Sequence, residues 1–76
     1  MNKIVIINDY DGDYCSLFVN GEMVYDNHSI ETRDLAKYTP IESITEINVE
    51  DYPGMCDYLL ECCTFKGMTL DQVLAL

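Results

Sequence analysis

Three aspartates near the start of the chain, each separated from the next by one residue, are the first candidates for chemistry. Carboxylates at this spacing suit hard cations such as calcium. A calcium loop of the EF-hand type, however, has glycine at its sixth position and glutamate at its twelfth, where this sequence has Tyr14 and Asn20. We therefore expect no metal here and interpret the run as an acidic loop that contacts another protein. Its candidate contact residues are Asp9, Tyr10, Asp11, Asp13 and Tyr14.

The cysteines and the single histidine lack the spacing of a metal or catalytic site. Structural zinc sites need two closely spaced ligand pairs, whereas the cysteines stand at positions 15, 56, 62 and 63. His28 precedes Ser29, but a nucleophile and its base work together only when the fold orients them toward each other. No glycine-rich phosphate loop or G-x-S-x-G motif occurs. We expect no enzymatic activity and no cofactor, and four reduced thiols, most of them in the core.

The acidic loop lies between two predicted strands. Residues 3–8 form a near-continuous run of β-branched side chains, which is typical of a central strand. Residues 14–19 form the second strand, and Asn20-Gly21 predicts a type I′ turn into a third strand over residues 23–26, because both central residues of that turn need positive φ. The expected register pairs Val19 with Glu22, Phe18 with Met23, Leu17 with Val24 and Ser16 with Tyr25.

The second half of the chain is predicted to be mainly helical. Asn27 or Ser29 can cap a short helix that ends near Tyr38, and residues 43–49 alternate weakly, as in a half-exposed strand. A second helix is expected from Asp51 to the Lys66-Gly67 stop, and residues 69–72 match a capping box for a last helix. The order β-β-β-α-β-α-α predicts one α+β domain over residues 1–76. Its small antiparallel sheet of about four strands is expected to carry the helices on one face.

The net charge of the chain limits the classes of molecule that it is expected to bind. Fourteen acidic residues face four basic ones, for a formal net charge of −10. Such a surface repels phosphate backbones and anionic membranes and attracts basic protein surfaces. The apolar run at residues 4–7 is too short for a membrane span or a signal peptide. We therefore expect a cytoplasmic protein that contacts neither nucleic acid nor a membrane directly.

One stretch resembles known sequences. Residues 17–30, L-F-V-N-G-E-M-V-Y-D-N-H-S-I, are similar to a segment of small uncharacterised proteins of bacteria and their phages. In those proteins a V-[ND]-G hairpin leads through a tyrosine to H-S-I and a short helix. The resemblance implies a phage or mobile-element origin and carries no established function.

These observations support two hypotheses. The first is a small acidic protein that docks on a basic surface of a larger protein, in its concrete form a phage-type inhibitor of a nucleic-acid enzyme. Its contact surface adds Glu31 and Asp34 to the acidic loop, and a second acidic patch is expected at Glu50, Asp51, Asp57 and Glu61. The alternative is a non-catalytic assembly module that forms a homodimer through apolar helices or a free strand edge.

Overall fold

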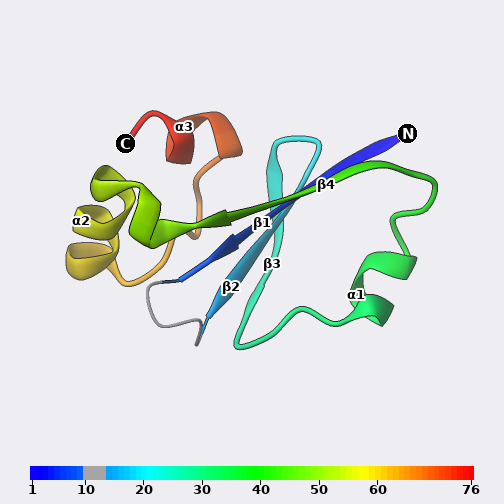
Figure 1. Ribbon diagram of the computed structural model, residues 1–76, viewed down its shortest axis with the longest axis horizontal. Helices are drawn as coiled ribbons and strands as arrows, with labels where there is room; N and C mark the ends of the chain where they lie inside the picture. Colours follow the sequence, from blue (N-terminus) through cyan, green and yellow to red (C-terminus); the bar gives the residue numbers. More distant parts are fainter. Residues whose placement is uncertain (10–13) are drawn as a thin grey trace.

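The fold is built on a four-stranded sheet with strand order β3-β2-β1-β4 (Figure 1). The computed structural model describes residues 1–9 and 14–76. Among the described residues, none of the helices has the length and apolarity needed to cross a membrane. The elements are β1 Asn2–Asn8, β2 Cys15–Val19, β3 Glu22–Asn27, α1 Thr32–Ala36, β4 Ile41–Asn48, the 3-10 turn η1 Val49–Asp51, α2 Pro53–Cys62 and α3 Leu70–Leu74.

The sheet is mixed, which confirms the α+β class but corrects the expected antiparallel arrangement. β1 pairs antiparallel with β2, and β2 pairs antiparallel with β3, as predicted. β4, however, pairs parallel with β1. The chain leaves β3 through α1 and returns on the far side of β1, and such a crossover brings β4 back in the direction of β1. β1 and β2 are therefore the central strands, and β3 and β4 are the edges.

Each face of the sheet has its own hydrophobic cluster. On one face, Ile7 and Phe18 pack with Phe65 and with residues of α2 and α3. On the other face, Ile4 and Leu17 pack with Leu35 of α1 and with the half-buried residues around that helix. In Figure 1, α2 and α3 lie together at one end of the molecule and α1 lies apart from them. The expected one-sided packing thus describes α2 and α3, while α1 packs on the opposite face.

The turn between β2 and β3 has the predicted geometry. Asn20 has φ 53° and Gly21 has φ 89°, as a type I′ turn requires. The predicted register holds for the first two pairs and is wrong beyond them, because a β-bulge shifts the pairing by one residue. Leu17 consequently pairs with Tyr25, and Ser16 pairs with Asp26. The bulge leaves Val24 43% exposed and lets Tyr25 pack in the cluster of Leu17.

Two predicted caps are corrected and one is confirmed. α1 begins later than expected, with Glu31 as its N-cap, and the N-cap of α2 is Tyr52 instead of Asp51. At the start of α3, Thr69 and Gln72 form the predicted capping box. The Thr69 hydroxyl accepts a hydrogen bond from the Gln72 N–H, and the Gln72 side chain accepts one from the Thr69 N–H.

α2 ends before the predicted Lys66-Gly67 stop. Cys63 adopts the left-handed conformation, with φ 67°, and its N–H donates to the Leu59 carbonyl. Cys62 and Cys63 are both exposed, and Cys15 and Cys56 are only half-buried, so the expectation that most cysteines belong to the core is wrong. The chain then returns through Phe65 to the sheet, and this return places residues 63–69 beside β3.

Candidate groove along the edge strand

A groove of about 930 Å³ lies between β3 and residues 63–69. At one end, Glu22 and Thr69 form a single antiparallel β-bridge, and the Leu70 N–H donates to the Gly21 carbonyl at 2.8 Å. Further along β3, the Thr64 hydroxyl donates to Asp26 Oδ2 at 2.7 Å. The segment that follows α2 is thus bound to the edge strand at two points, and the groove lies between the two segments.

Asp26 is one of the three carboxylates that line this groove. It lies in register with Ser16, which in turn pairs with Ile7, so its side chain belongs to the sheet face that α2 covers. Its Oδ1 is shielded from solvent and has no hydrogen-bond partner among the described residues. The ion pairs of the described residues join Lys3 to Glu42 and Arg33 to Glu31, so they leave Asp26 without a lysine or arginine partner.

Tyr14 and His28 line the groove beyond Asp26, away from Glu22. Their rings meet edge to face with centroids 5.2 Å apart. The negative charge of Asp26, followed by partial desolvation, raises the pKa of Tyr14 above its usual value. The phenol of Tyr14 therefore stays protonated beside the carboxylate well above neutral pH.

We expect an Asp26→Asn substitution to lower the pKa of Tyr14 toward the ordinary tyrosine value of about 10. The substitution removes the negative charge that disfavours the tyrosinate but keeps the shape of the side chain. An NMR titration of the tyrosine ring carbons measures this pKa directly. In the matched control Asp57→Asn, on the exposed side of α2, the pKa of Tyr14 should not change. An unchanged pKa of Tyr14 in Asp26→Asn would contradict the conclusion that the charge of Asp26 raises it.

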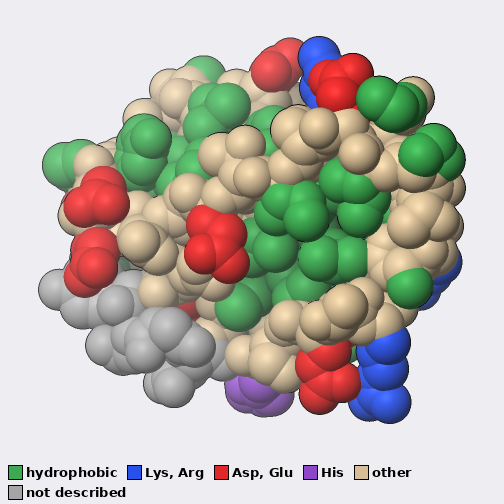
Figure 2. Space-filling model, turned by 45° about the vertical axis from the view of Figure 1, so that its right-hand side comes forward, with side chains coloured by type: hydrophobic (Ala, Val, Ile, Leu, Met, Phe, Trp, Pro, Cys, Tyr) green, Lys and Arg blue, Asp and Glu red, His purple; other side chains and the backbone are tan. Residues whose placement is uncertain are grey.

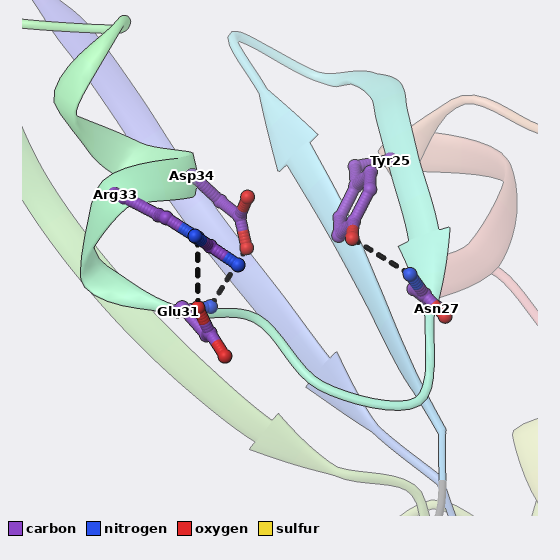
Figure 3. A network of polar contacts seen from close by, with 5 residues as sticks. All are labelled: Tyr25, Asn27, Glu31, Arg33 and Asp34. Carbon is purple, nitrogen blue, oxygen red and sulfur yellow. Dashed lines mark hydrogen bonds and ion pairs between the residues drawn. The ribbon is translucent and has the colours of Figure 1, made fainter.

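Glu31 and Asp34 are placed at the beginning of α1, where they serve the helix itself (Figure 3). The Glu31 N–H donates to Asp34 Oδ2 at 2.8 Å, which satisfies a backbone donor that the helix leaves free. The Glu31 carboxylate pairs with Arg33 Nε at 2.8 Å. Neither residue lines the groove. Their carboxylates are therefore less available to a partner than the sequence suggested.

The structure brings together only part of the predicted contact surface. Asp9 and Tyr14 line the groove, whereas Tyr10, Asp11 and Asp13 lie outside the described residues. Sequence reasoning missed the rest of the groove lining, including Asp26, Thr64, Lys66 and Met68. The only signal for Asp26 was its place at the end of the third predicted strand.

The His, Cys, Asp and Glu side chains of the described segments form no metal-binding cluster. Within residues 1–9 and 14–76, no three His, Cys, Asp or Glu side chains are grouped so that they could hold a metal ion. The Cys15 thiol donates to Asn8 Oδ1 at 3.3 Å, and burial, with the charges of Glu46 and Asp9, raises its pKa. A thiol that stays protonated is a poor nucleophile.

Comparison of the chain with protein-family models, curated proteins and solved structures gives no match.

Proposed function

We propose that this chain is an acidic interaction protein that docks on a basic surface of a larger protein. The supporting observation is an uncompensated acidic surface on η1 and α2, which we call the α2 acidic face. All of its carboxylates are exposed, and none forms an ion pair with a lysine or arginine of the described residues. The face comprises Glu50, Asp51, Asp57 and Glu61.

An exposed leucine borders this face. Asp57 and Glu61 are four residues apart on α2 and therefore lie on the same side of the helix. Leu60 lies between them in the sequence and is 82% exposed, and Tyr52 at the start of α2 is 43% exposed. Protein interfaces commonly combine an apolar or aromatic anchor with a polar rim. We expect Leu60 to enter an apolar pocket that basic residues of the partner surround.

Fixed carboxylates on a folded domain can occupy a site that normally holds phosphates. In the specific form of the proposal, the basic surface is the nucleic-acid site of an enzyme, and the chain inhibits it by occupying that site. The proposal assigns no catalytic step to the chain. It places the protein in the cytoplasm, where its free cysteines stay reduced.

The test begins with capture of the partner. The immobilised protein is exposed to bacterial lysate at low salt, and the retained protein is eluted with high salt or with DNA. The eluted partner is then purified and titrated by calorimetry against Asp57→Lys/Glu61→Lys. We expect its affinity to fall at least about tenfold, because two attractive contacts become repulsive.

The matched control is Glu42→Lys/Glu46→Lys, which changes the net charge equally but lies on β4. This control variant should weaken binding only slightly, because it changes only the long-range electrostatic attraction to the partner. Equal losses in the two double variants would show that net charge alone acts, and no loss in either would contradict electrostatic docking.

One feature favours the alternative of self-association. β4 is an eight-residue edge strand with Ile44 52% exposed, and such edges can pair with a second copy. Figure 2 also shows hydrophobic side chains gathered at the centre of one face of the molecule. Light scattering distinguishes the two functions. A dimer that persists at high salt supports assembly, and a monomer at all salt concentrations supports docking on another protein.

A further inference from the structure

The groove along β3 has the chemistry of a site for an organic cation. Three of its lining residues are acidic, Asp9, Glu22 and Asp26, and Lys66 is its only lysine or arginine among the described residues. Unlike the carboxylates of the α2 acidic face, these line a concave surface. Charges on the walls of a cleft focus their field in it, because the walls have a low dielectric constant.

Asp26 is the residue that a bound cation would compensate. The Thr64 hydroxyl donates to Oδ2 and the Tyr14 hydroxyl also interacts with this carboxylate, whereas Oδ1 is shielded from water and lacks a hydrogen-bond partner among the described residues. A carboxylate removed from water without full compensation is costly, and a nearby positive charge relieves this cost. The described residues place hydroxyl groups near the Asp26 carboxylate, but none of their lysines or arginines lies within ion-pair distance of it.

The remaining walls suit a long side chain that ends in a cation. The Tyr14 ring, held edge to face against His28, lies at one end, and a cation over its face is attracted by the ring electrons. Met23 and Met68 line the groove toward its other end. Methionine adapts its shape to apolar groups, and the methylene stems of basic side chains pack well on such surfaces.

We infer that the groove receives an arginine side chain of the partner protein. The planar guanidinium can donate to a carboxylate while it stacks on an aromatic ring, whereas a lysine ammonium acts as a point charge. A volume of about 930 Å³ accommodates the side chain and its neighbouring residues and is far larger than a metal ion needs. The inference rests on the proposed function, because the arginine belongs to the partner.

A short peptide tests the inference without the partner. The probe is Gly-Val-Arg-Val-Gly with blocked ends, added to the full chain while amide NMR signals are followed. The matched control peptide carries citrulline, which has the shape of arginine without its charge. We expect saturable shifts at residues 23–26 and 64–68, and at least about tenfold weaker binding of the citrulline peptide.

Two variants of the chain complete the test. Asp26→Asn should weaken binding of the arginine peptide about tenfold, and Asp57→Asn on the α2 acidic face should leave it unchanged. Glu22→Gln, at an exposed position of the same groove, provides a second measurement should Asp26→Asn unfold.

Each of three results would overturn the inference: equal affinity for both peptides, unchanged binding in both groove variants, or shifts confined to the α2 acidic face. A partner that binds through that face while the peptide leaves the groove unshifted would refute the groove site and retain the proposed function. Peptide binding in the groove with no partner captured would weaken the proposed function alone.

Discussion

Replacing Phe18 with alanine is expected to lower the free energy of unfolding by about 3–5 kcal/mol. Phe18 is fully buried in β2, a central strand, and belongs to the cluster that joins the sheet to α2 and α3. Truncation removes apolar contacts and leaves a cavity that the rigid sheet cannot close. A domain of 76 residues has a total stability of about 4–11 kcal/mol, so this variant would be marginally folded at best.

Urea denaturation followed by circular dichroism measures the loss. Leu60→Ala is the matched control, because Leu60 is 82% exposed and its truncation should change stability by less than about 0.5 kcal/mol. Should Phe18→Ala fail to fold, Phe18→Leu keeps most of the volume and gives a smaller, measurable loss of about 1–1.5 kcal/mol. A loss below about 1 kcal/mol in Phe18→Ala would contradict the central place of this side chain.

The features that were predicted correctly depend on residues close together in the sequence. The β-branched run of β1 indicates a central strand without reference to any other segment. The Asn20-Gly21 turn and the Thr69–Gln72 capping box each depend on backbone conformations within four residues. In each of these three cases, all the residues that determine the local structure lie within one short stretch of sequence.

The features that were missed depend on contacts between distant segments. The direction of β4 follows from the crossover through α1, and an alternating pattern is the same for parallel and antiparallel strands. The bulge at Val24 brings Tyr25 opposite Leu17, where it packs in the Leu17 cluster, and the sequence of the turn does not reveal this pairing. Cys63 ends α2 in the left-handed conformation that usually favours glycine, so the glycine at position 67 misled the prediction.

The candidate site also has one feature that the sequence predicts and others that depend on contacts between distant segments. The sequence predicts the sign of the surface charge, because charge needs no fold to be counted. It does not predict the groove, since the two walls lie about 40 residues apart in the chain and are joined by long-range contacts such as Thr64–Asp26 and Glu22–Thr69. Tyr14 was chosen for its acidic neighbours in the sequence, yet the acid that raises its pKa is Asp26, which lies on β3.

The two proposed contact surfaces are joined by the chain itself. α2 carries Asp57 and Glu61, and the residue directly after this helix, Cys63, already lines the groove. A partner that covers the exposed side of α2 is therefore close to the groove as well. An arginine in the groove would fix the orientation of the bound partner, while the α2 acidic face would attract the partner over a longer range.

An Asn20→Ala substitution is expected to lower the free energy of unfolding by about 2 kcal/mol, because two costs add. Asn20 has φ 53°, a conformation that disfavours alanine. Its side chain also joins the hairpin to β1: Oδ1 accepts from the Lys3 N–H at 3.0 Å, and Nδ2 donates to Asn2 Oδ1 at 2.9 Å. Both side-chain contacts are solvent-exposed, so their share of the loss is the smaller one.

The matched control Asn20→Gly separates these costs. Glycine adopts positive φ without strain but lacks the two side-chain hydrogen bonds, so it should lose about 1 kcal/mol or less. Urea midpoints for the two variants give the difference. A larger loss in alanine than in glycine assigns most of the cost to the backbone conformation of the turn. Equal losses would instead mean that the turn relaxes at no cost and that the contacts with β1 hold the hairpin in register.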